Sequence, residues 1–175
     1  MANTLDLLTA NRTLLAQAVH LLDGLDATAY TQTAPPLYTS GVGGHLRHVL
    51  DHVVAFLDGC AQGEVDYDAR AREAVLERDP AAMRAALRAV DARLGALGAA
   101  DLERPLRVRM DCGPAAPWAG SSVARELQFL VGHATHHFAL IALMLRHQGR
   151  AVDADLGVAA STRHHRERLA GAPAR

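Results

Sequence analysis

The sequence has few aromatic residues, few cysteines and no excess of charge of either sign. Of its 175 residues 4% are aromatic, two are cysteines, and the formal net charge is −1 with histidine neutral. Cys60 and Cys112 are too few for a disulfide framework, and their spacing matches no zinc motif. The balanced charge provides no basic surface for a nucleic acid. No basic-then-apolar segment opens the chain, and no apolar run reaches the roughly 18 residues that span a bilayer. We therefore expect a cytoplasmic protein that binds neither nucleic acid nor membrane.

The residues that are abundant favour helices. Half of the chain is hydrophobic, and alanine and leucine dominate. Both residues have high helix propensity, so helices packed through small side chains are favoured over a β-sandwich. The length suits one domain with a sizeable core. Because no internal repeat or linker-like stretch is present, we expect a single domain over residues 1–175, with residues 160–175 as a C-terminal tail.

Apolar periodicity and capping residues predict four long helices. These run from Asn3 or Thr4 to about Leu22, from Ser40 to Gly59, from Asp79 to about Leu97, and from Ser121 or Ser122 to Arg146. Four helices with pooled apolar faces predict an all-α four-helix bundle. The long connections after the second and third helices leave the order of the helices open.

The segments between these helices give weaker signals. Residues 26–38 are expected to form an ordered loop, residues 62–67 a polar connection and residues 69–77 a short helical piece. Apolar and charged residues alternate over 105–111, which predicts a short extended segment near 105–112. A short helix is expected over 161–169, with His164 and His165 on the surface.

Histidine is the anomaly of the composition. Eight of the ten histidines fall in three clusters: His45, His48 and His52; His133, His136 and His137; and His164 and His165. His133 and His137 are four residues apart, so on a helix they lie on one face, which is also the apolar face. Two imidazoles on a buried face need partners. A metal ion would satisfy both, and so would carbonyl or carboxylate groups in the core.

The cluster in the second helix faces a similar choice. His45, His48 and His52 lie within about 60° on one side of that helix, either as metal ligands or as a partly exposed polar stripe. Asp51 is either an acceptor for an imidazole N–H or an ordinary solvated charge. One to three histidines from this helix, added to the pair on the last helix, would leave a metal with open coordination positions. That layout is typical of a catalytic rather than a structural site.

Two motifs together resemble a known family. Ser40-Gly-Val-Gly-Gly-His-Leu-Arg-His-Val-Leu-Asp-His52 is followed some eighty residues later by Arg125-Glu-Leu-Gln-Phe-Leu-Val-Gly-His-Ala-Thr-His-His-Phe-Ala-Leu-Ile-Ala142. The pair resembles the DinB superfamily from the first helix to about residue 160. The resemblance implies an up-down-down-up bundle with three histidines holding a divalent metal, nickel or zinc in many members.

The resemblance also implies which residues bind the metal. The family's ligand on the second helix falls at His48, and its pair on the last helix falls at His133 and His137, so that His45, His52 and His136 become bystanders or supporting groups. Many members follow the last ligand with Arg-Gly-Gln, whereas Phe138-Ala-Leu140 follows here. The resemblance therefore implies the metal site but no function that is tied to the more polar version.

The favoured hypothesis is a metal-dependent enzyme that acts on a small molecule, either a hydrolase or a thiol S-transferase, the latter implied by thiol-using relatives. Glu126 lies on the ligand face about two turns before His133 and is a candidate for an acid, a base or a hydrogen-bond partner of a ligand. The alternative is a non-catalytic metal-binding or stress-related helical protein. The family also implies a homodimer. Binding of exogenous anions or thiols at the metal would separate the two hypotheses.

Overall fold

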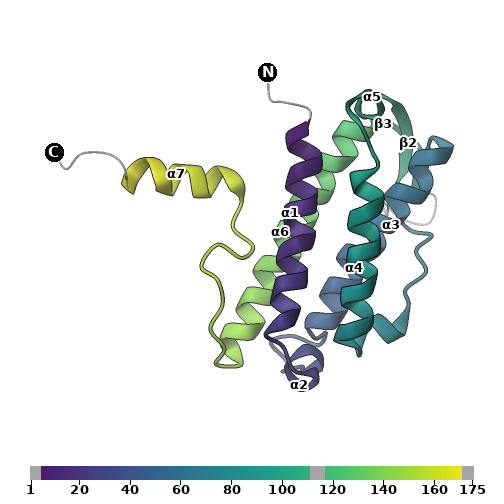
Figure 1. Ribbon diagram of the computed structural model, residues 1–175. Coiled ribbons are helices and arrows are strands. Elements are labelled where there is room, and N and C mark those ends of the chain that lie inside the picture. Colours follow the sequence, from purple (N-terminus) through teal and green to yellow (C-terminus); the bar gives the residue numbers. More distant parts are fainter. Residues whose placement is uncertain (1–4, 111–116, 171–175) are drawn as a thin grey trace.

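The computed structural model describes residues 5–110 and 117–170, most of which are helical. Four long helices form the body of the molecule: α1 (Leu5–Asp23), α3 (Val42–Gln62), α4 (Pro80–Gly95) and α6 (Val123–His147). α1 packs against α4 and α6, and α3 also packs against α4 and α6. In Figure 1, α1 and α6 start at the end of the molecule near α5, whereas α3 and α4 start at the end near α2.

The starts of α4 and α6 confirm the predicted capping. The Asp79 carboxylate accepts hydrogen bonds from the backbone N–H groups of Ala81 and Ala82, and Pro80 occupies the first helical position, where no N–H is needed. The Ser122 hydroxyl accepts from the N–H of Arg125 at 3.2 Å. Local hydrogen bonding therefore fixes both starts. The predicted cap of α1 at Asn3 or Thr4 lies outside the described residues.

Both predicted ends of α3 were wrong. Its cap is Gly41 rather than Ser40, and the helix continues past Gly59 to Gln62, where Gly63 adopts a left-handed conformation with φ 79°. Gly59 has a packing role instead. A Cβ at Gly59 would lie 2.3 Å from the Glu64 carbonyl oxygen, so the missing side chain lets the following strand fold back against the helix.

A small sheet closes one end of the helices. β1 (Glu64–Asp66) pairs in parallel with β2 (Pro105–Arg109), and β2 pairs antiparallel with β3 (Ala119–Ser122). The extended segment near 105 is therefore confirmed through Arg109, whereas Asp111 and Cys112 lie outside the described residues. The prediction of a polar connection over 62–67 was wrong, because these residues contain strand β1. β1 forms by pairing with β2, some forty residues later in the chain, and the local sequence does not reveal this pairing.

Short helices complete the chain. They are α2 (Ala27–Thr31), the 3-10 turn η1 (Ala74–Glu77), α5 (Ala99–Leu102) and α7 (Ala160–Ala170). α2 lies within the predicted loop 26–38, and η1 lies within the predicted helical piece 69–77. α4 ends at Gly95 and is followed by α5, so the third predicted helix was slightly too long.

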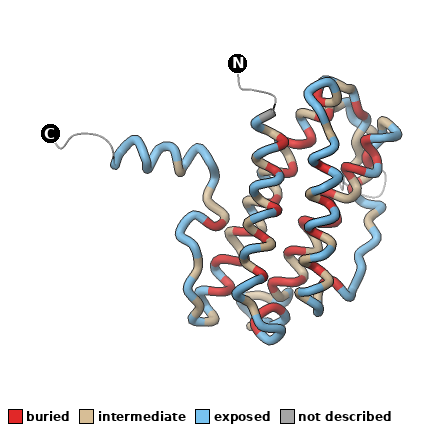
Figure 2. Tube along the Cα trace, viewed as in Figure 1, coloured by how far each residue is buried: buried red, intermediate tan, exposed pale blue. Residues whose placement is uncertain are grey.

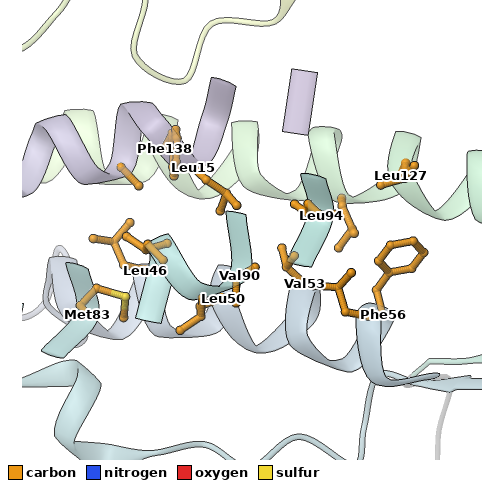
Figure 3. Close-up of a cluster of buried hydrophobic side chains, with 14 of the residues drawn as sticks. Leu15, Leu46, Leu50, Val53, Phe56, Met83, Val90, Leu94, Leu127 and Phe138 are labelled. Carbon is orange, nitrogen blue, oxygen red and sulfur yellow. The ribbon is translucent and has the colours of Figure 1, made fainter. Parts of the chain in front are cut away.

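The core lies between the four long helices. Leu15 of α1, Leu46 and Val53 of α3, Leu94 of α4 and Phe138 of α6 point toward one another in Figure 3 and are each at most 4% exposed. α7 differs from these helices. It has no buried residue and lies apart from the body in Figures 1 and 2.

One described helix, α6, is long and apolar enough to cross a membrane, with a mean hydropathy of 1.3 over 18 residues. Core helices of water-soluble proteins pass the same test. α6 contacts both α1 and α3, and it carries the buried carboxylate of Glu126. We therefore interpret α6 as a core helix.

Candidate metal centre

The facing surfaces of α3 and α6 bring His48, His133 and His137 together. The ring centroid of His48 lies 4.9 Å from that of His133 and 4.7 Å from that of His137. The centroids of His133 and His137 are 4.7 Å apart. One potential ligand nitrogen from each residue lies within 4.8 Å of the other two. All three side chains are half-buried. Helical spacing accounts for the His133 and His137 pair, and the packing of α3 on α6 adds His48.

Burial keeps these three imidazoles neutral. Desolvation is the largest cause in each case, and the neighbouring histidines add to it. Together they lower the pKa of His48 from 6.5 to about 4 and the pKa values of His133 and His137 to about 3. A neutral imidazole has one free lone pair, which is the form that binds a metal.

The residues present fit a metal. His133 Nδ1 is buried and has no hydrogen-bond partner among the described residues, and a polar atom in that position normally has one. Zinc–nitrogen bonds are about 2.0–2.1 Å long and the ion prefers tetrahedral geometry, so the nitrogens on one ion lie about 3.3–3.4 Å apart. From the 4.8 Å limit, the nitrogens would need to approach one another by at most about 1.5 Å, which side-chain rotation supplies.

His52 is close to the centre but has partners for both ring nitrogens. Its Nδ1 donates to the His48 carbonyl oxygen at 2.8 Å, which leaves Nε2 to accept from Arg70 Nη1 at 3.3 Å. Its ring centroid lies 4.0 Å from that of His133 and 5.5 Å from the stacked ring of Tyr67. His52 therefore supports the position of the His133 ring and has no free lone pair for a metal.

His45 contacts His137 directly. Their Nδ1 atoms are 2.9 Å apart, so one nitrogen carries a hydrogen and the other accepts it. If His137 is to bind a metal through Nε2, its Nδ1 must carry the hydrogen and His45 Nδ1 must accept it. Desolvation lowers the pKa of His45 as well, which favours this neutral acceptor. His45 is thus placed to fix the tautomer of His137.

The other predicted histidines lie apart from the centre. His136 is exposed, and its ring reaches only the edge of His137, with centroids 5.1 Å apart. His164 and His165 are exposed on α7, as predicted.

Glu126 is buried, and its carboxylate accepts hydrogen bonds from two hydroxyl groups. Tyr67 Oη donates to Glu126 Oε2 at 2.8 Å, and Ser121 Oγ donates to Oε1. Tyr67 in turn stacks on His52, so Glu126 reaches the histidines through two intervening rings. Its role as an acid or base stays a prediction. Sequence reasoning missed Tyr67 and Arg70, because both follow β1 and only the tertiary fold brings them to α3.

Asp51 is buried rather than solvated, which corrects one expectation. Its carboxylate forms an ion pair with Arg47, and Arg47 also binds Glu77 at 2.6 Å. Burial raises the pKa of Asp51 more than Arg47 lowers it. No hydrogen bond joins Asp51 to an imidazole within the described part of the chain. Asp51 instead pairs with Arg47, and Arg47 links α3 to η1 through Glu77.

The glycines before the histidines permit this packing. A Cβ at Gly43 would lie 2.3 Å from the Glu77 carbonyl oxygen and 2.6 Å from the Tyr30 ring. Tyr30 is buried and donates from its hydroxyl to the Leu76 carbonyl at 2.5 Å. The start of α3 is therefore fixed by close contact with α2 and η1, just before the turn that carries His45 and His48.

Comparison with known proteins identifies a family for most of the chain. The model of the DinB superfamily matches residues 7–141, which contain all three histidines of the centre. No curated protein sequence and no solved structure matches the chain. Because the match covers about three quarters of the sequence, the chain belongs to the DinB superfamily.

Proposed function

We propose that the protein binds one divalent metal ion through His48, His133 and His137 and uses it to act on a small molecule. The observation that carries this proposal is the convergence of three neutral imidazoles, one of which has a buried nitrogen without a partner. Nickel or zinc is the proposed metal, because imidazole ligands suit both. Bound there, the metal would supply a Lewis acid that activates water or a thiol.

The residues around the centre support an open site. Three ligands leave coordination positions free, and the three histidines are half-buried rather than fully enclosed. His45 would hold the tautomer of His137, and His52 would pack against the ring of His133. We propose a hydrolase or a thiol S-transferase. We also propose that α1, α3, α4 and α6 form the up-down-down-up four-helix bundle of the family, which their pairwise packing supports.

The first experiment is metal content by elemental mass spectrometry on untagged protein. We expect about one divalent metal per chain in the wild type, and loss of that metal in each of His48→Ala, His133→Ala and His137→Ala. His164→Ala is the matched control, since it removes an exposed histidine from α7. Metal retained in the three variants, or lost only when His52 is changed, would contradict the assignment.

A second experiment separates a catalytic from a purely structural metal. The cobalt-substituted protein is titrated with azide and with a low-molecular-weight thiol while its visible spectrum is recorded. An open site binds the added ligand, and the spectrum changes. An unchanged spectrum would favour the non-catalytic alternative.

We further propose a homodimer on the basis of family membership alone. Sedimentation equilibrium tests this proposal, and a monomer at every concentration would contradict it.

A further inference from the structure

A cavity of about 490 Å³ lies beside the histidine centre, between the segment 37–40 and the C-terminal half of α6. Its walls are mainly the apolar side chains of Leu37, Leu140, Leu143 and Met144, and His45 also lines it. The volume falls within the range of small-molecule sites, which is about 300–1,000 Å³. His45 thus has one ring nitrogen against His137 and its ring against the cavity.

The wall of the cavity formed by the loop is held in place before any ligand arrives. Ala34 and Tyr38 exchange backbone hydrogen bonds of 3.1 and 3.2 Å, which close the loop that presents Leu37 and Tyr38. The Tyr38 ring also meets His147 edge-on, with centroids 5.9 Å apart. A preformed wall reduces the entropy that a ligand must pay on binding.

Two hydrogen-bond donors in this lining have no protein acceptor. Tyr38 Oη is buried and without a partner among the described residues. If His45 Nδ1 accepts from His137, as metal binding requires, then His45 Nε2 carries a hydrogen, and nothing in the described part of the chain accepts it. No acidic residue lines the cavity. These features suit a ligand whose head group is an acceptor.

The mouth of the cavity is apolar as well. Leu37 is 70% exposed and Leu143 is 62% exposed, so two leucine side chains that line the cavity also contact solvent. An apolar chain entering the cavity would cover both side chains and bring its head group toward Tyr38 and His45.

We propose that this cavity binds the substrate of the metal site, and that the substrate is a small molecule with an apolar body and a carboxylate or carbonyl head group. The role as substrate and the hydrogen on His45 Nε2 rest on the proposed function, whereas the apolar cavity and the unpartnered hydroxyl of Tyr38 do not. His45 links the two sites, since the residue that fixes His137 also donates to the head group.

Octanoate is the probe, titrated by calorimetry into metal-free protein, with octylamine as the matched cation. We expect octanoate to bind at one site and octylamine to bind about tenfold more weakly, because no carboxylate lines the cavity to pair with an ammonium group. Leu143→Gln keeps a helix-forming residue and should weaken octanoate binding about tenfold. Leu169→Gln on α7 is the control at equal exposure and should have no effect. Tyr38→Phe removes only the hydroxyl and should weaken octanoate binding about fivefold.

Several results would overturn the inference. These are no octanoate binding, equal binding of octanoate and octylamine, and equal effects of the two glutamine substitutions. A shift of the Leu143→Gln variant to a smaller species in sedimentation, with no octanoate binding by the wild type, would show that a second copy covers the mouth. Metal content is measured separately, on the protein as purified and before the metal is removed. Octanoate binding by a protein that carries no metal as purified would contradict the proposed function alone, and metal in a protein that does not bind octanoate would contradict this inference alone.

Discussion

α6 and α7 both carry adjacent histidines, yet the two helices have opposite surroundings. On α6, His133 and His137 lie on a face that packs against α3, and their pKa values are lowered to about 3. On α7, His164 and His165 are exposed on a helix without a buried residue. The number of histidines therefore does not identify a site. What identifies it is a four-residue spacing on an apolar helix that faces further histidines.

The largest expected contrast between the two helices is in packing. Phe138→Ala on α6 removes a ring that is 1% exposed and should lower the free energy of unfolding by about 3–5 kcal/mol. Leu169→Ala on α7 removes a side chain that is 64% exposed and should change it by less than about 0.5 kcal/mol. Denaturant unfolding measures both. Equal costs would mean that α7 packs against the body in solution.

Metal should stabilise the protein through α6 and not through α7. Free zinc or nickel at about 100 times its dissociation constant should raise the free energy of unfolding by about 2.7 kcal/mol. The gain should vanish in His133→Ala and remain in His164→Ala, as followed by denaturant unfolding with and without metal. A gain that survives in His133→Ala would place the metal elsewhere.

A smaller effect is expected from the partner of a ligand. His45→Ala removes the acceptor at His137 Nδ1 and should weaken metal binding about 10–100-fold, measured by competition with a chromophoric chelator. His136→Ala removes a neighbouring exposed ring from the same turn of α6 and should leave the affinity nearly unchanged. If both variants behave alike, the contact between His45 and His137 does not act on the metal.

The smallest expected effect is the pH dependence of the metal-free protein. In the unfolded chain the pKa values of His48 and His133 are near the ordinary value of 6.5. In the folded protein they are lowered to about 4 for His48 and about 3 for His133. The unfolded chain therefore binds more protons, and stability is lost as the pH falls below about 6.5. From about pH 8 to about pH 6 the loss is at most about 0.8 kcal/mol per histidine, reduced by partial exposure. His133→Leu should make the dependence shallower, and His165→Ala should not. A steeper dependence in His133→Leu would contradict the assigned direction.

Local signals in the sequence predicted the helices well. Asp79 followed by Pro80 and the cap at Ser122 depend on residues within one turn, so the starts of α4 and α6 were predicted correctly. Features set by distant contacts were missed. Gly59 does not end α3, because its role is to admit β1, and β1 itself exists only through pairing with β2.

The same distinction applies to the candidate site. Helical spacing was sufficient to place His133 and His137 on one face. It did not separate His48 from His45 and His52, because all three lie on one side of α3, and the choice of His48 came from the family resemblance. The structure separates them by their partners. His52 uses both ring nitrogens, and His45 contacts Nδ1 of His137. The His48 ring lies at similar distances from the rings of His133 and His137.

The position of the three histidines on helices far apart in the chain has a consequence for assembly. His48 belongs to the first half of the sequence, and His133 and His137 belong to the second. The exposed stretch around Arg72, which has φ 54°, connects the two halves. If the chain were cut there, a metal held by all three histidines would act as a reversible cross-link between two separate polypeptides. The metal would then strengthen an association that the packing of α1 and α3 on α4 and α6 already favours, and a chelator would weaken it.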